Sequence, residues 1–473
     1  MKTNEELYQE RLKRYVTACY NEQPDRIPLR VFSEELSSKY AGYSNFEAAV
    51  NHEIQFEVNR KFAVDHGCDA IQTNSIVNWA GMMKSIGWKF AKFPGIELPV
   101  DSCTQWTEPV TEEEALLKEN EYDVFIDDPT AFMLNVWLPR FTSHINQSGK
   151  PVTFEHNMSF INGLIAYNQF FNEWGNAHDR LIDSGIVPAV SSTLKAPLDI
   201  MGDKLRGYMN LVTDLLVRRE KVIEACHALM PHLLHVVLSS ADPDKNIPSI
   251  IWMHRGHVPF ISMEDFNEIY WPTLKPIIEE LWANGHQIIL YAEGDWTPHL
   301  EAFAELPEKS VIFHIDKTDV LKAHEILGEK FCLSGGIPNY MLSHSSASEV
   351  RSYCKKIIDA VARDGGYIMD ASALIMDDAK TENVKEMIDF TLNYGGYSKT
   401  PTVKDLDELK NVSRPLAGQY SFQQFKRPPG TCIPWSEKRN DFTKFVEDEN
   451  IVRRMWEKID SQGYSFCWTN LTW

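Results

Sequence analysis

Short apolar runs of strand length alternate with longer segments of helical periodicity along most of this chain. The runs are rich in Val and Ile and end in polar residues, as strands buried on both faces do. Helical patterns separate many of the runs, for example at 205–229, 263–283, 320–328, 347–363 and 383–394. The candidate strands are 29–32, 70–77, 152–156, 187–192, 249–254, 287–293, 311–316, 331–335 and 367–371.

This alternation predicts an α/β protein with a parallel sheet covered by helices. We favour a closed (β/α)8 TIM-type barrel over an open sheet, because no Gly-rich nucleotide loop follows an early strand. Such a barrel needs eight strands, so one of the nine candidates is superfluous. We expect the barrel and its N-terminal helices within 1–397, an insertion of loops around 79–150, and a C-terminal extension, 398–473, packed on the barrel.

The most informative polar residues end two consecutive candidate strands. The first run reads QIILYAEGD and carries Glu293, and the second reads VIFHID and carries His314. Reactive side chains of parallel α/β enzymes lie at the carboxyl ends of strands. Glu293 and His314 therefore predict a metal site or an acid–base pair, although a buried, hydrogen-bonded structural pair fits the same pattern.

Other strand ends and loops supply further candidates. His254 ends the run IIWMH, and Glu155 and His156 end VTFEH, so each could contact a substrate; Asp370 near the last strand is a weaker candidate. Aromatic side chains could line a pocket for a ring, and a Gly-Gly pair could let a cofactor approach the backbone closely. Core packing and a tight turn explain the same residues, which are Phe32, Trp79, Trp252, Trp296, Gly335 and Gly336.

Composition narrows the classes of partner. The formal charge is −20, from 47 Lys+Arg against 67 Asp+Glu, which argues against broad binding to nucleic acid or anionic membranes. The eight cysteines are scattered without a CxxC pair, as reduced thiols are. The charged N-terminal segment lacks the apolar core of a signal peptide, so we expect a cytoplasmic protein.

Three landmarks together resemble the uroporphyrinogen decarboxylase superfamily. They are Asp25-Arg26-Ile27-Pro28, the block HIDKTDVLKAHEILGEKFCLSGGIPNYML at 314–342, and GGYIMDASALIMDDAKTENVKEM at 365–387. The resemblance implies a (β/α)8 barrel, in agreement with the strand count. True decarboxylases carry a second pair of arginines after Arg26. Here the corresponding stretch reads LRVFSEELSSKYAG, in which Arg30 is present but the rest of that motif is not.

Within that superfamily the chain is most similar to corrinoid-dependent methyltransferases. Where thiol-methylating members carry a zinc-binding His-x-Cys pair, this chain reads Tyr291-Ala292-Glu293. It resembles instead the O-demethylase components, which transfer a methyl group from a methoxylated compound to the cob(I)alamin of a separate corrinoid protein. That resemblance implies a possible zinc held by Glu293 and His314 with Glu279 or Glu280. It implies no corrinoid in this chain, which lacks an Asp-x-His-x-x-Gly motif.

Three hypotheses follow. The first is a methyltransferase that acts on a small methoxylated aromatic compound, with release of the phenolate assisted by zinc or by protonation from His314 or Tyr291. The second is a decarboxylase of a cyclic or aromatic acid, and the third is a catalytically silent barrel that serves as an assembly partner. A homodimer is compatible with each of them.

Overall fold

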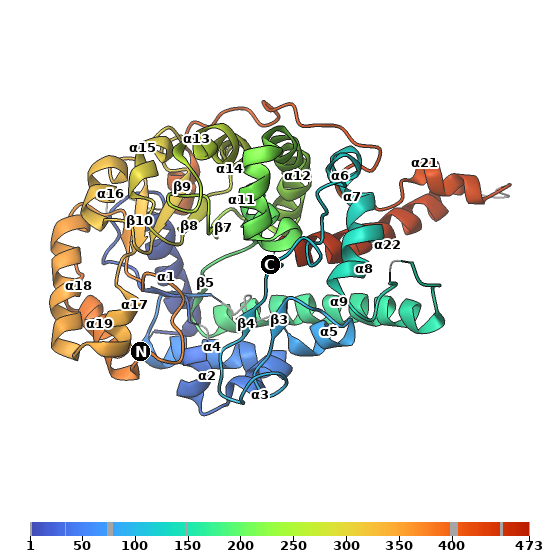
Figure 1. The fold of residues 1–473 in the computed structure, drawn as a ribbon. Coiled ribbons are helices and arrows are strands. Elements are labelled where there is room, and N and C mark those ends of the chain that lie inside the picture. Colours follow the sequence, from blue (N-terminus) through green and yellow to red (C-terminus); the bar gives the residue numbers. More distant parts are fainter. Residues whose placement is uncertain are drawn as a thin grey trace.

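Eight parallel strands close into a barrel in the computed structural model, which describes residues 2–33, 35–72, 79–147, 149–397, 405–444 and 448–472. Helices surround the barrel, and a helical arm projects from one side of the molecule (Figure 1). The strands are β1 (Arg30–Val31), β2 (Ala70–Ile71), β3 (Ala91–Lys92), β4 (Gln105–Trp106), β5 (Val187–Pro188), β6 (Thr193–Lys195), β7 (Ser249–Met253), β8 (Ile288–Ala292), β9 (Val311–Ile315), β10 (Cys332–Gly335) and β11 (Tyr367–Ile368).

Barrel closure depends on two junctions. One sheet has the order β1-β2-β5 and another has the order β11-β10-β9-β8-β7-β6. Strands β5 and β6 are two ends of one extended segment, because Ser191 and Ser192 continue the backbone pairing toward β7. At the other junction Leu29 pairs in parallel with Met369. The cycle therefore contains eight strands, with β5 and β6 counted as one, and the predicted (β/α)8 barrel is confirmed.

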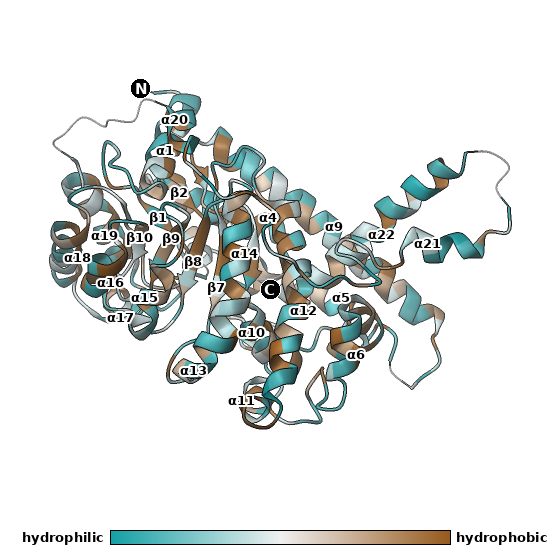
Figure 2. Cartoon of the chain, turned by 90° about the horizontal axis from the view of Figure 1, so that it is seen from above, coloured by the Kyte–Doolittle hydropathy of each residue, from teal (hydrophilic) through white to brown (hydrophobic). Residues whose placement is uncertain are grey.

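A helix follows every barrel strand. In chain order these are α4 (His52–His66), α9 (Phe154–Asp183), α12 (Arg219–Ser240), α14 (Trp271–Ala283), α15 (Leu300–Phe303), α16 (Val320–Leu327), α18 (Ala347–Val361) and α19 (Thr381–Tyr394). In Figure 2 the barrel strands are coloured mainly as apolar, whereas the surrounding helices carry both polar and apolar residues. Helix α12 is long and apolar enough to cross a membrane by length and composition, but most of it is buried in this layer.

The additional elements extend the barrel at its ends and edges. They are α1 (Asn4–Cys19), α2 (Glu35–Ala41), α3 (Asn45–Val50), α5 (Ala80–Ser85), α6 (Tyr122–Asp127), α7 (Pro129–Phe132), η1 (Met133–Trp137), α8 (Leu138–Phe141), α10 (Pro197–Ile200), η2 (Met201–Arg206), α11 (Tyr208–Val217), α13 (Met263–Asp265), η3 (Phe266–Tyr270), η4 (Thr297–His299), α17 (Asn339–His344), α20 (Leu406–Lys410), α21 (Trp435–Lys438), η5 (Arg439–Asp441) and α22 (Glu449–Thr472). The region predicted as a loop insertion holds α5 to α8 and the antiparallel pair β3–β4.

The superfluous strand is the one predicted at 152–156. Residues from Phe154 onward are the first turn of the 30-residue helix α9. The Thr153 hydroxyl accepts a hydrogen bond from the His156 amide at 3.2 Å, and the His156 ring accepts one from the Thr153 amide at 3.3 Å. Val and Thr favour strands, but this reciprocal cap and the long amphipathic pattern that follows it outweigh that local preference. Of the strand predicted at 70–77, residues 73–77 lie outside the described residues.

A buried ion pair spans the closure between β1 and β11. Arg30 Nε donates to Asp370 Oδ2 at 2.9 Å, and both side chains are fully buried. The same guanidinium donates to Ser334 Oγ at 2.8 Å and contacts His314 Nδ1 at 2.9 Å. One side chain on β1 therefore connects β9, β10 and the end of β11 inside the barrel.

We predict that Asp370→Asn lowers the free energy of unfolding by about 3 kcal/mol, because it leaves the Arg30 cation buried without its carboxylate. Chemical denaturation measures the change. The matched control is the exposed Asp364→Asn, which should change the value by less than about 0.5 kcal/mol. The double variant Arg30→Met/Asp370→Leu should recover most of the loss; equal stability of Asp370→Asn and the unaltered protein would contradict this role of the pair.

Candidate functional site

Strand register places two ionisable side chains together at the carboxyl end of the barrel. On β7 and β8, Trp252 pairs with Tyr291. Because alternate residues of a strand share a face, His254 and Glu293 lie one step above that pair on the same side. His254 Nε2 is 3.6 Å from Glu293 Oε2, and about half of the Glu293 side chain is exposed. The predicted candidates His254 and Glu293 therefore face each other at the barrel mouth.

Asp203 connects His254 to a lysine. Asp203 Oδ2 lies 3.0 Å from His254 Nδ1 and accepts a hydrogen bond from Lys195 Nζ at 2.7 Å. Lys195 is the last residue of β6, whereas Asp203 belongs to the π-helical turn η2. The result is a chain of alternating charge from Lys195 through Asp203 and His254 to Glu293.

A second carboxylate fixes the backbone beneath the imidazole. Asp199 accepts hydrogen bonds from the amides of His254 at 3.1 Å and Arg255 at 2.9 Å, and from the Tyr270 hydroxyl at 2.9 Å. Asp199 lies in α10, one turn before Asp203. The segment after β6 therefore holds both the main chain and the ring of His254.

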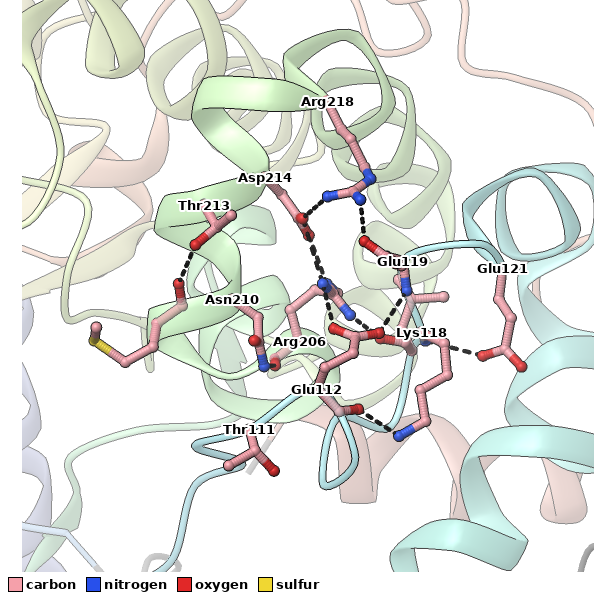
Figure 3. Close-up of polar contacts among 12 residues, drawn as sticks. Thr111, Glu112, Lys118, Glu119, Glu121, Arg206, Asn210, Thr213, Asp214 and Arg218 are labelled. Carbon is pink, nitrogen blue, oxygen red and sulfur yellow. Dashed lines mark hydrogen bonds and ion pairs between the residues drawn. The ribbon is translucent and has the colours of Figure 1, made fainter.

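Ion pairs on the far side of η2 hold this segment against the insertion, as Figure 3 shows. The fully buried Asp214 accepts from Arg206 Nε at 2.5 Å and from Arg218 Nη1 at 2.8 Å. Arg206 also pairs with Glu112 at 2.8 Å and donates to the Leu117 carbonyl at 2.6 Å. Because Arg206 ends η2, these bonds position the turn that carries Asp203.

A cavity of about 360 Å³ opens above His254 and Glu293. This volume is at the small end of the usual range for small-molecule sites. Its floor comes from strand ends and its walls from the β3–β4 ribbon, η2, the loop after β11 and the end of α22. The ionisable lining residues are Glu108, Lys195, Asp203, Lys204, His254, Arg255 and Glu293, and the apolar ones are Phe90, Trp106, Trp252, Leu374 and Met376.

The charge chain favours a protonated imidazole. Burial and the Lys195 ammonium oppose the charged form of His254, but the carboxylates of Asp203 and Glu293 outweigh them and raise the pKa of His254 above its ordinary value. Burial also opposes ionisation of Asp203, yet Lys195 and His254 hold the pKa of that carboxyl well below its usual range. The two carboxylates therefore favour the imidazolium form of His254 at the floor of the cavity.

His314 lies one layer deeper in the barrel than the prediction requires. It pairs in register with Tyr291 rather than with Glu293. Its Nδ1 contacts Arg30 and Ser334, and its Nε2 lies 3.1 Å from the Ser372 carbonyl. Burial, with the nearby Arg30 cation, lowers the pKa of His314 well below its ordinary value. His314 is therefore a neutral core residue, and the structure does not bring it together with Glu293.

Tyr291 is also a core residue and not the predicted proton donor. Its ring stacks on His314 at a centroid separation of 4.3 Å and is 1% exposed. Burial and nearby carboxylates, Glu293 foremost, raise the pKa of Tyr291 well above its ordinary value. A phenol so placed cannot reach a substrate in the cavity.

The Gly-Gly pair is explained by packing around that layer. Gly335 and Gly336 have φ of 80° and 81°, in the left-handed region that favours glycine. A Cβ at Gly335 would lie 2.8 Å from the His314 ring, and one at Gly336 would lie 2.8 Å from Val320. These contacts account for both glycines without the predicted cofactor.

Trp252, like His254, lines the cavity as predicted, and the other predicted substrate contacts lie outside it. Phe32 and Asp370 are buried inside the barrel, and Trp296 is buried beneath the mouth, where its indole donates to the Glu293 carbonyl at 2.9 Å. Trp79 donates to the Val50 carbonyl at 3.0 Å near α4 and α9. Glu155 and His156 occupy the first turn of α9 at the surface.

The predicted zinc ligands are not assembled. Glu279 lies on the outer side of α14, where it accepts a hydrogen bond from Tyr420 of the C-terminal extension. His314 is in the core and Glu293 is at the mouth. Within the parts of the chain that the structure describes, no three His, Cys, Asp or Glu side chains form a group that could hold a metal ion. These residues therefore do not fit the predicted site.

Sequence reasoning missed Lys195, Asp203, Lys204 and Glu108 as cavity residues. Lys195 had a usable signal, because it ends the apolar stretch AVSSTLK at a strand terminus. Asp203 and Lys204 lie in a π-helical turn, and Glu108 follows the β3–β4 ribbon. The periodicity of helices and strands does not indicate where side chains of such irregular segments lie, so their position at the barrel mouth could not be predicted.

Comparisons with known proteins agree with this architecture. Residues 187–394 match the family model described as Uroporphyrinogen decarboxylase (URO-D). This segment runs from β5 to the end of α19 and contains Lys195, Asp203, His254 and Glu293. Among solved structures, a methyltransferase from Methanosarcina mazei has a TM-score of 0.50 and 13% sequence identity, with coverage of 81% of this chain and 98% of that chain. At that identity the likeness concerns the fold. No curated protein matches.

We predict that Asp203→Asn lowers the pKa of His254, because it removes the carboxylate that offsets burial and the Lys195 cation. Nuclear magnetic resonance of the labelled histidine rings measures the titration. Since the folded-state pKa is raised, its contribution to stability is fully present below the unfolded pKa and is lost as the pH rises through the folded pKa. An unchanged His254 titration in Asp203→Asn would contradict the assignment; His286, at the opposite end of β8, is the internal control.

Proposed function

Because residues 187–394 match the uroporphyrinogen decarboxylase family model, we propose that the chain is a methyltransferase of that superfamily. We further propose that it takes the methyl group from a small methoxylated aromatic compound and passes it to the cob(I)alamin of a separate corrinoid protein. The observation that carries the proposal is the His254 imidazole, which contacts Asp203 through Nδ1 and lines a cavity with aromatic walls.

The cavity walls suit an aromatic ring. Phe90, Trp106 and Trp252 supply flat apolar surfaces, on which a ring gains both burial and favourable aromatic contacts. Leu374 and Met376 complete the apolar wall. A ring bound there would present a methoxy substituent to the polar floor that His254 and Glu293 form.

The chemistry assigned to the chain's own residues is proton transfer and positioning. As the bond between methyl carbon and ether oxygen breaks, its electron pair stays on the oxygen, and the His254 imidazolium donates its Nε2 proton there. The methyl group leaves to the external nucleophile, and the product is a neutral phenol. Asp203 stabilises the imidazolium before the transfer and keeps its ring oriented, while a proton from solvent restores the charged form afterwards.

The size of the cavity is consistent with an acceptor supplied from outside. About 360 Å³ admits a substituted ring, whereas a corrin macrocycle with its side chains is far larger. The chain also lacks the Asp-x-His-x-x-Gly motif of corrinoid carriers. The corrinoid therefore has to be presented at the open mouth by another protein.

No specific observation favours either alternative, the decarboxylase or the catalytically silent barrel. A decarboxylase would use free arginines at the mouth, but Arg255 is bound through both terminal nitrogens to Glu108, at 2.6 and 2.5 Å, and Arg30 is paired with Asp370 in the core. A silent barrel would bury its candidate residues, yet the Glu293 side chain is 52% exposed toward the cavity.

We predict that His254→Asn lowers the rate constant of methyl transfer from a methoxybenzene to cob(I)alamin by about 10²- to 10⁴-fold, as loss of a general acid does. Single-turnover absorbance of the corrinoid measures the rate. The loss should shrink as nitro substituents make the departing phenolate more stable, because such a leaving group needs less protonation.

The matched control for that experiment is His286→Asn, which removes an imidazole at the other end of β8 and should retain the full rate. An equal loss for all leaving groups in His254→Asn would assign His254 to positioning. A variant with the full rate on every substrate would remove His254 from the chemistry.

A further inference from the structure

Lys204 has an unusual environment for an ammonium group. Its side chain is 3% exposed, and it lines the cavity. The Nζ atom lies 5.1 Å from the ring centroid of Trp106 and 5.6 Å from those of Trp88 and Phe90. Three aromatic faces therefore surround this cation, which favours a positive charge but does not replace the hydrogen bonds of water.

The nearest carboxylates already have other partners. Asp203, the preceding residue, is bound to Lys195 and His254. Glu108 is bound through both oxygens to Arg255. Among the described residues Lys204 Nζ has no ion pair, whereas Lys195 beside it has one at 2.7 Å. A buried ammonium without a carboxylate is costly, so an anionic ligand would stabilise the charged form of Lys204.

The charge balance of the cavity agrees with an anionic ligand. Four cationic side chains line it, namely Lys195, Lys204, His254 and Arg255, against the three carboxylates of Glu108, Asp203 and Glu293. This local excess is positive although the chain as a whole carries a formal charge of −20. A ligand with one negative charge would neutralise the cavity.

We propose that Lys204 binds the carboxylate of the substrate, so that the methoxylated aromatic compound is a benzoate-type acid. The inference rests on the proposed function for the methoxy group, but the anion site itself does not. Lys204 and Asp203 are adjacent in η2, so the same turn holds the carboxylate anchor and, through Asp203, the proton donor. The ring would lie between them against Phe90, Trp106 and Trp252.

Protonation of Lys204 should accompany binding. Burial, aided by the neighbouring Lys195 and opposed by Asp203 and Glu108, lowers the pKa of Lys204 to about 7. The empty site can therefore hold a neutral amine at little cost, and an arriving carboxylate stabilises the ammonium form. Affinity for the anion should be constant below pH 7 and fall about tenfold per pH unit above it. The other charged groups that face Lys204 across the cavity are His254, Arg255 and Glu293.

Isothermal titration calorimetry of the full chain tests the proposal, with benzoate and 4-methoxybenzoate as probes and neutral methoxybenzene as the reference. In Lys204→Met we expect benzoate to bind about ten- to a hundredfold more weakly, the loss typical of a charge-assisted hydrogen bond. Methoxybenzene should bind equally to both proteins. Titrations in buffers of different ionisation enthalpy should show proton uptake with benzoate at pH 7.5.

The matched control is Lys92→Met, which removes an exposed lysine from β3 outside the cavity lining. It should leave every affinity unchanged. Equal benzoate affinity in Lys204→Met and the unaltered protein, or binding without proton uptake, would overturn the inference.

Failure of this inference is distinguishable from failure of the proposed function. Methyl transfer from neutral methoxybenzene with no preference for benzoates would overturn the anion site and leave the methyltransferase intact. Benzoate binding that depends on Lys204, without methyl transfer from any methoxylated ring, would support the anion site and overturn the methyltransferase.

Discussion

The Arg30–Asp370 ion pair stands at the closure of the barrel, and the arrangement of the mouth depends on that closure. Backbone pairing between Leu29 and Met369 completes the cycle of strands, and the guanidinium beneath it links β1 to β9, β10 and the end of β11. A closed barrel makes all strand ends converge on one axis. Without closure, β6 and β8 would still flank β7. The cavity wall formed by the loop after β11, which carries Leu374 and Met376, would be lost.

In the closed barrel the inward side chains lie in layers, and ionisable side chains in different layers have different pKa shifts. Tyr291 and His314 share a dry layer in which burial shifts both pKa values toward the neutral forms. One step higher, His254 and Glu293 meet a cavity and a network of charges, and the same type of imidazole is driven toward its charged form. The difference between the two histidines is one of position along the strand, because burial without a carboxylate favours the neutral ring and a nearby carboxylate favours the cation.

The barrel could be predicted from the sequence, because apolar runs and helical periodicity indicate which residues of each strand and helix are buried. Eight of the nine candidate strands correspond to barrel strands, and the ninth was wrong because a Thr153 cap looks like a β-branched strand start. The site was harder. Glu293 and His314 end consecutive strands, but the spacing of residues along the sequence does not determine the register between two strands. In the structure His314 pairs with Tyr291, two residues before Glu293, so the two predicted side chains lie in different layers. Lys204 and Glu108 could not be predicted, since long-range ion pairs such as Arg206–Glu112 hold their irregular segments in place.

One turn of η2 carries both the proposed anion anchor, Lys204, and Asp203, the carboxylate that contacts the proton donor. A crystal structure with bound 4-methoxybenzoate tests whether a single ligand engages Lys204 and His254 together. We expect the ring between Phe90, Trp106 and Trp252, the methoxy oxygen about 2.6–3.2 Å from His254 Nε2, and the carboxylate on Lys204 Nζ. A ligand bound with its methoxy group away from His254, or in a different cavity, would contradict the central claim that His254 releases the leaving group.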